Sequence, residues 1–201
     1  MKRISPKEGK ELVSLARKSI EYYFHTNKIL DYCPKGKVLE ESCGVFVTLH
    51  CWPSNELRGC IGFPEPVMPL YRAVIEAAVS SAFSDDRFPK LQFEELGSII
   101  IEVSVLTKPE EIKFKSPEGL KKKIIIGKHG LIAEKGFSRG LLLPQVPLEW
   151  KWDSGEFLEN SCMKAGLSRD CWKDGKTRFY SFEGIIFREK KPKGEVEKIK
   201  G

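Results

Sequence analysis

The 201-residue sequence contains no apolar segment that approaches the roughly 18 residues needed for a membrane-spanning helix. The first residues, from Met1 to Pro6, lead directly into a charged helical pattern without the apolar core of a signal peptide. We therefore expect a cytoplasmic protein with no membrane partner. A composition of 41% hydrophobic and 31% charged residues is typical of a globular chain, and no repeat or low-complexity segment interrupts it.

Metal-binding motifs are also missing. None of the six cysteines forms a Cys-x-x-Cys pair, and only His25, His50 and His129 could add imidazole ligands. We therefore expect no structural zinc site, and no motif identifies a cofactor. Abundant Lys, Glu and Ile favour a thermophilic source, in which intracellular disulfides occur, so a pair such as Cys162 with Cys171 remains open.

The sequence has little excess charge outside its end. The net charge is +6, and residues 188–201 contain six Lys or Arg and three Glu, a net of +3. The preceding residues therefore carry the other +3. We expect 188–201 to be a charged tail that frays, and we rank nucleic acid third among partners, after a small-molecule or anionic ligand and a partner protein.

What is present is a series of helix and strand signals. Ser5, Pro6 and Glu8 form a capping box with proline at the first helical position, which predicts a helix over 6–27. Strands arrive in runs and hairpins rather than in alternation with helices, so we expect an α+β fold with mostly antiparallel sheets. The other predicted elements are strands at 45–52, 99–106 and 179–187, helices at 68–83 and 154–162, and a hairpin joining 124–126 to 131–133.

The stretch from Leu57 to Gly62 is the candidate site. It places the Cys60 thiol two residues from the Arg58 guanidinium, with a glycine on either side of the thiol. A four-residue loop at 53–56 would put Cys60 opposite Leu49 on the apolar face of the preceding strand. A loop one residue shorter or longer would move it to the face of Thr48 and His50, since a one-residue slip exchanges the faces. The sequence leaves this register open.

Cys60 is the candidate nucleophile, with His50 or His129 as its proton acceptor. It is also compatible with a role as a small buried filler. Arg58 fits either a carboxylate or phosphate ligand or an internal ion pair with Glu102 or Asp85. The residues that we expect to bind a ligand are Arg58, Gly59, Gly62, Asp85, Arg87 and Glu102.

Asp85 and Arg87 are also expected to pair with each other and fix a loop. Glu102 lies among apolar neighbours in its predicted strand, where a carboxylate needs water, a cation or a hydrogen-bond donor.

Over roughly residues 5–187 the chain resembles the AMMECR-one domain family. The resemblance implies one domain of two α+β subdomains interleaved in sequence, with a cleft between them near the glycine-rich stretch. It implies no settled activity. It does imply a modification pathway shared with a Memo-type protein and a radical S-adenosylmethionine enzyme. The matching blocks are 44–49, 57–62, 81–83, Asp85, 87–89, Leu91, 94–96, 101–106, 126–130, 143–146, 164–167 and Trp172.

Three functions are consistent with these residues. The first is an enzyme, or an enzyme subunit, that uses Cys60 and Arg58 in a cleft. The second is a non-enzymatic adaptor that docks a ligand or a partner protein. The third is nucleic-acid binding, which requires an affinity that falls steeply with salt. Enzyme and adaptor rank nearly equal, and the sequence does not reveal the oligomeric state.

Overall fold

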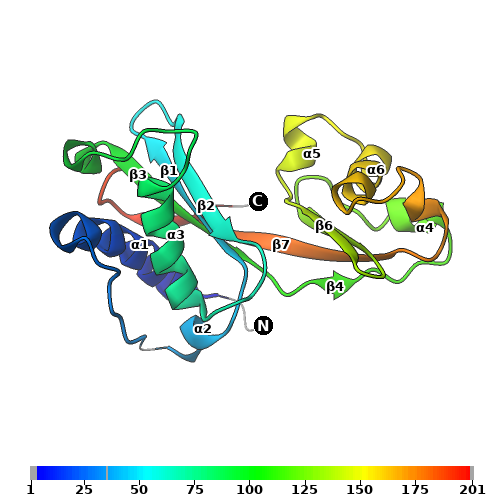
Figure 1. The fold of residues 1–201 in the computed structure, drawn as a ribbon, viewed down its shortest axis with the longest axis horizontal. Helices are drawn as coiled ribbons and strands as arrows, with labels where there is room; N and C mark the ends of the chain where they lie inside the picture. The colour runs from blue at the N-terminus through cyan, green and yellow to red at the C-terminus, as the bar shows by residue number, and fades with distance from the viewer. Residues whose placement is uncertain (1–3, 35, 200–201) are drawn as a thin grey trace. The chain divides into compact units, whose positions relative to one another are not determined.

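The computed structural model describes residues 4–34 and 36–199, which divide into two compact units (Figure 1). Unit 1 takes the chain up to residue 106 and from 185 onward, and unit 2 takes residues 107–184. The last long strand, β7, contributes residues to both. Six strand pairings in the described residues are antiparallel, and helices pack on the strands, so the predicted α+β fold is confirmed.

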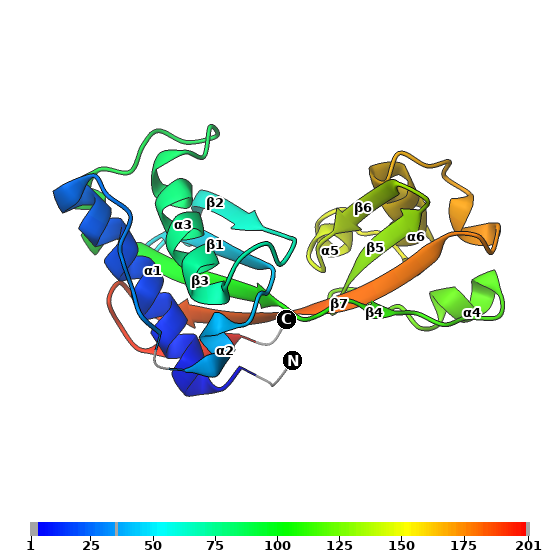
Figure 2. The ribbon, with the colours of Figure 1, turned by 60° about the horizontal axis from the view of Figure 1, so that its bottom comes forward.

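Unit 1 is built from a sheet with two long helices on one face. Strand β1 pairs with β2 on one side and with β3 on the other, and β3 neighbours β7, which pairs with β8. Helices α1 and α3 lie side by side (Figures 1 and 2). The elements are α1 (Pro6–Thr26), α2 (Lys37–Glu40), β1 (Val45–Cys51), β2 (Leu57–Phe63), α3 (Leu70–Phe83), the 3-10 helix η1 (Phe93–Gly97), β3 (Ile99–Leu106), β7 (Arg178–Glu189) and β8 (Val196–Ile199).

The core of unit 1 forms where alternate residues of β1 and β3 meet α1 and α3. Val47 and Leu49 are fully buried, as are their partners Val103 and Ile101 on β3. Because successive side chains of a strand point to opposite faces, Thr48 and Glu102 lie on the face away from these helices. The alternation predicted for this strand is confirmed, although β1 ends at Cys51 rather than at Trp52.

Capping side chains fix the starts of α1 and of the long helix of unit 2. The Ser5 hydroxyl accepts a hydrogen bond from the Glu8 N–H, and the Glu8 carboxylate accepts one from the Ser5 N–H, which is the predicted capping box. Asp153 caps the long helix of unit 2 by accepting hydrogen bonds from the N–H groups of residues 155 and 156. Both helices therefore begin where side-chain acceptors meet the unpaired N–H groups of the first turn.

Unit 2 is a smaller sheet covered by a helix. Strand β5 lies between β6 and the first part of β7, and β4 pairs with β7. Helix α6 packs on β5 and β6. The elements are β4 (Glu110–Glu111), α4 (Pro117–Lys121), β5 (His129–Lys135), β6 (Ser138–Leu142), α5 (Val146–Glu149), α6 (Ser154–Lys164) and the 3-10 helix η2 (Cys171–Lys173).

The predicted hairpin of unit 2 is wrong in its first arm. Residues 124–126 form no strand, because turn hydrogen bonds from Lys123 and Ile124 continue the winding of α4. The hairpin instead joins β5 to β6 through a turn at Gly136, whose φ of 60° suits a residue without a side chain. Cys162 and Cys171, which the sequence left open, form a disulfide.

The prediction that residues 188–201 fray is wrong for the part that the structure describes. Strand β7 continues to Glu189, and β8 folds back onto it. Glu189 is buried and binds Arg17 of α1 through two hydrogen bonds of 2.7 and 2.5 Å. The net positive charge of this segment gave no indication that Glu189 binds it to the core.

Candidate functional site

Three polar side chains form a row across β2, β1 and β3, on the face away from α1 and α3. Thr48 of β1 is the register partner of Cys60 on one side and of Glu102 on the other. The Thr48 hydroxyl lies 3.2 Å from the Cys60 sulfur and donates a hydrogen bond to it. We call Cys60, Thr48 and Glu102 the Cys60 row.

A β-bulge sets the register that the sequence left open. His50 pairs with Leu57 but Leu49 pairs with Gly59, so Arg58 has no partner on β1. This extra residue moves Cys60 from a position opposite Val47, on the core face, to a position opposite Thr48 on the other face. Of the two predicted alternatives, the one that places Cys60 on the face of Thr48 and His50 is therefore confirmed, and the one that places it opposite Leu49 is wrong.

The backbone of Cys60 is held by a pair of charged side chains from the loop after α3. Strand β2 is the edge of its sheet, and the Cys60 N–H donates to Asp85 Oδ2 at 2.8 Å. Arg87 Nη2 donates to the Cys60 carbonyl at 3.1 Å. Arg87 also donates from Nε and Nη2 to the two Asp85 oxygens, at 2.9 and 2.8 Å, which confirms the predicted pairing. We call these two residues the Asp85–Arg87 clamp.

The pKa of Asp85 is lowered, whereas the pKa values of Cys60 and Glu102 are raised. The Arg87 guanidinium holds the pKa of Asp85 well below its usual range. Burial raises the pKa of the Cys60 thiol, and the Thr48 hydrogen bond and the Arg87 charge lower it less than burial raises it. Burial also raises the pKa of Glu102, and Arg188, with Nη1 3.9 Å from Glu102 Oε2, opposes that rise. The resting site therefore favours a protonated thiol.

The two candidate histidines lie in different units. His50 belongs to β1 in unit 1, on the same face as Thr48. Its two ring nitrogens are buried, and neither makes a hydrogen bond of good geometry with any residue in 4–34 or 36–199. Burial lowers its pKa, which favours the neutral imidazole. His129 begins β5 in unit 2, where its Nδ1 accepts a hydrogen bond from the Ile125 N–H at 3.2 Å.

Arg58 is occupied inside unit 1. Its Nε and Nη2 donate to the two Glu95 oxygens at 2.7 and 3.0 Å, and only 10% of its side chain is exposed. An internal ion pair was one of the predicted alternatives, but its predicted partners, Glu102 and Asp85, are wrong. Arg58 pairs instead with Glu95 of η1. The pKa of Glu95 is lowered by this guanidinium. A ligand at Arg58 would have to displace a two-point internal ion pair.

The two glycines of the stretch are required by packing. A Cβ on Gly59 would lie 2.2 Å from the Ser81 carbonyl oxygen of α3, and one on Gly62 would lie 2.3 Å from the Val45 carbonyl oxygen. The hydroxyl of the same serine also contacts β2, because it accepts a hydrogen bond from the Ile61 N–H at 2.9 Å. These contacts explain both glycines without a ligand.

Two members of the site were missed by the sequence reasoning. Thr48 gave a signal in its alternation with buried valines but was read only as a position on a face. Arg188 was assigned to the tail, although its strand neighbour Glu189 is buried. Both were missed because strand pairing, rather than any local motif, brings them to Glu102.

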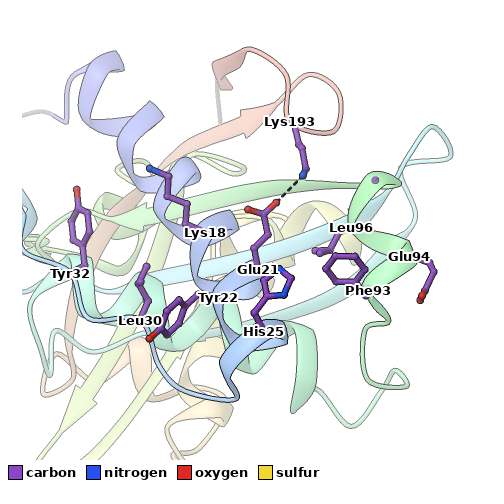
Figure 3. A pocket seen from close by; sticks show the side chains of 11 residues that line it. Lys18, Glu21, Tyr22, His25, Leu30, Tyr32, Phe93, Glu94, Leu96 and Lys193 are labelled. Atoms are coloured by element: carbon purple, nitrogen blue, oxygen red, sulfur yellow. Dashed lines mark ion pairs between the residues drawn. The ribbon is translucent and has the colours of Figure 1, made fainter.

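A separate pocket of about 920 Å³ lies over the exposed side of α1 (Figure 3). Figure 3 shows Tyr22 and Leu30 on one side of the helix and His25 facing Phe93 on the other. Lys193 closes one end through an ion pair of 2.9 Å with Glu21. A smaller pocket of about 450 Å³ in unit 2 is lined by residues 111–117 and 173–178, apart from Lys176. Neither pocket includes a member of the Cys60 row.

No helix in 4–34 or 36–199 is long and apolar enough to cross a membrane. In the same part of the chain, no group of three or more His, Cys, Asp or Glu is placed to hold a metal ion.

The fold and the site together define an α+β protein with a polar site on the sheet face of unit 1 that lies away from α1 and α3. The AMMECR1 family model matches residues 13–187, and the chain belongs to this family. It is 51% identical to protein PYRAB00100 of Pyrococcus abyssi and 50% identical to protein MJ0810 of Methanocaldococcus jannaschii. The alignments cover 98% of this chain in both cases, and 98% and 97% of those proteins.

A solved structure gives the same fold. The crystal structure of the uncharacterized protein PH0010 from Pyrococcus horikoshii matches with a TM-score of 0.81 and 48% sequence identity, over 98% of each chain. These relatives come from thermophilic archaea, as the composition predicted, and their names state no activity.

Proposed function

We propose that unit 1 binds a small polar molecule on the Cys60 row. The observation that carries this proposal is the state of Glu102: its side chain is 16% exposed, and no residue in the described chain donates a hydrogen bond to it. A carboxyl group in such surroundings is costly unless a donor or a cation satisfies it, and Arg188 approaches only to 3.9 Å. A ligand donor between Glu102 and Thr48 would satisfy it.

Ligand-observed NMR of a library of small polar fragments tests this proposal. Thr48→Val removes the hydroxyl and Glu102→Gln replaces the carboxyl by an amide, each with little change in volume, so we expect fragments bound at this site to lose at least tenfold in affinity. Glu94→Gln changes an exposed carboxylate of the same unit and is the matched control. Fragments that bind equally well to all four proteins, or a complete absence of binding, would overturn the proposal.

A second candidate is an enzyme in which Cys60 attacks the bound molecule. The observation that favours it is His50, a neutral imidazole on the same face with no hydrogen bond of good geometry from any described residue. Because burial raises the pKa of the thiol, a nearby base has to accept its proton before attack. His50 is the base on this sheet face.

Alkylation of Cys60 by iodoacetamide tests this role. If His50 accepts the proton, His50→Ala should slow labelling at about pH 7.5 and have progressively less effect as the pH is raised toward 11, because hydroxide then removes the thiol proton without a base. Equal slowing at both pH values would indicate a purely structural histidine and would contradict the enzymatic role.

The family resemblance adds a proposal about partners. We propose that the chain acts in the cytoplasm with a Memo-type protein and a radical S-adenosylmethionine enzyme in a modification pathway. Mixing the three purified proteins and measuring complex formation by analytical ultracentrifugation tests it. Sedimentation as separate species, with and without S-adenosylmethionine, would contradict it.

A further inference from the structure

The Arg87 guanidinium contacts Cys60 and is also open to solvent. Its side chain is 57% exposed, whereas that of Arg58 is only 10% exposed. Its Nε and Nη2 are bound to Asp85 and to the Cys60 carbonyl, but its Nη1 donates to no described residue. The guanidinium is therefore held through Nε and Nη2, and the N–H groups of Nη1 remain as donors for a ligand.

The hydrogen bonds of the clamp direct its negative charge inward. Asp85 is buried, and its two oxygens accept from the Cys60 N–H, from the Arg87 N–H and from the Arg87 side chain. The outward-facing group is thus the cation. Among the charges nearby, exposed Asp86 and the Glu102 carboxyl oppose an anion beside the thiol, whereas Arg188 favours one.

We propose that Arg87 is the anion-binding residue of the Cys60 site, and that the ligand carries a carboxylate or phosphate group held beside the thiol. A guanidinium that is already fixed through Nε and Nη2 loses little conformational freedom when it binds an oxyanion, and its Nη1 offers two N–H donors in the guanidinium plane. This inference rests on the proposed function, because it requires that the ligand occupy the Cys60 row.

Two alkylating reagents that differ only in charge test the inference without knowledge of the natural ligand. In each reaction the Cys60 thiolate forms a bond to the CH2 carbon, the carbon–iodine bond breaks, and iodide leaves with the electron pair. Iodoacetate carries a carboxylate, and iodoacetamide is its neutral counterpart. Since the same thiolate attacks both, the ratio of the two rates cancels the thiol pKa and reports the attraction for the anion.

We expect the iodoacetate-to-iodoacetamide rate ratio at Cys60 to exceed the ratio at exposed Cys33 by at least fivefold, as measured on separated peptides by mass spectrometry. Inorganic phosphate, compared with sodium chloride at equal ionic strength, should slow iodoacetate at Cys60 and leave iodoacetamide unchanged.

Three variants separate the charge from the clamp. Arg87→Gln should bring the Cys60 ratio down to that of Cys33, and Arg87→Lys should retain only part of the excess. Asp86→Asn leaves every clamp hydrogen bond in place and removes the opposing charge, so the ratio should rise. In all three, the iodoacetamide rate reports whether the thiol itself has been disturbed.

The failures are distinguishable. If Cys60 reacts with iodoacetamide but the ratio equals that of Cys33 and is insensitive to phosphate and to Asp86→Asn, the anion site is overturned and the proposed function survives. If Cys60 reacts with neither reagent in the folded protein, the row is closed to ligands, and both proposals are overturned.

Discussion

We expect the ion pair between Arg17 and Glu189 to be the polar interaction of unit 1 whose loss destabilises the fold most. Arg17 binds both Glu189 oxygens and also donates to the carbonyls of Leu96 and Ile99, at 3.1 and 2.8 Å. Glu189 in turn accepts the Ile101 N–H at 3.0 Å. Their side chains are 8% and 4% exposed. The pair thus joins α1, η1, β3 and β7 inside the core.

Replacing Glu189 by Gln keeps the volume but leaves the Arg17 charge buried without an anion. Breaking a buried pair in this way costs about 3–5 kcal/mol. For a chain of this length, each kcal/mol corresponds to about 2–4 °C, so the melting temperature should fall by about 6–20 °C. The double variant Arg17→Met, Glu189→Leu should lose less than the sum of the single variants, because it leaves no unpaired charge.

Guanidinium unfolding followed by circular dichroism measures this loss, and hydrogen–deuterium exchange locates it. Peptides of β3 and β8 should lose protection, while those of β5 and β6 in unit 2 serve as an internal reference. Glu195→Gln is the matched control, since Glu195 pairs with Lys190 on the surface of the same segment. A loss below about 1 kcal/mol for Glu189→Gln would refute the reasoning that this pair anchors the end of the chain.

Three further predictions concern other contacts. Gly59→Ala should cost about 1–3 kcal/mol in urea unfolding, because its Cβ would meet an α3 carbonyl at 2.2 Å, whereas Gly97→Ala, with nothing within 4 Å, should be neutral. The depressed pKa of Asp85 stabilises the fold fully above about pH 4 and progressively less as the pH falls below it, so Asp85→Asn should flatten the pH dependence of the unfolding free energy between about pH 5 and pH 2. Reducing the Cys162–Cys171 disulfide, which spans nine positions, should cost unit 2 about 2.5 kcal/mol, as measured by exchange in its peptides.

Local chemistry made much of the fold predictable. The capping box at Ser5 and the N-cap at Asp153 fix helix starts through side chains within three residues of the N–H groups that they bind. The strand 99–106 was predicted with its observed bounds, because its β-branched residues face a buried surface. In contrast, the apolar run 124–126 satisfied the strand composition and yet formed no strand. A run of three residues does not show whether a partner strand exists.

Longer-range interactions decided the rest. The partner of Arg58 is 37 positions away, and that of Arg17 is 172 positions away, so neither spacing leaves a local pattern. The tail was predicted to fray from its charge alone, but one buried carboxylate outweighs the surrounding lysines, because it binds a guanidinium and a backbone N–H in the core. A test of nucleic-acid binding by deleting 188–201 would therefore damage unit 1, and neutralising exposed lysines is the sounder control.

The site depends on the least predictable feature of all, the extra residue at Arg58. If the register continued from the His50–Leu57 pair without this bulge, Cys60 would lie opposite buried Val47 on the core side of the sheet and could meet no ligand. With it, a thiol, a hydroxyl and a carboxyl from three strands share one sheet face. The bulge also turns Arg58 inward to Glu95, which leaves Arg87 as the cation beside the thiol. A single inserted residue thus exposes the candidate nucleophile and also decides which arginine can accompany it.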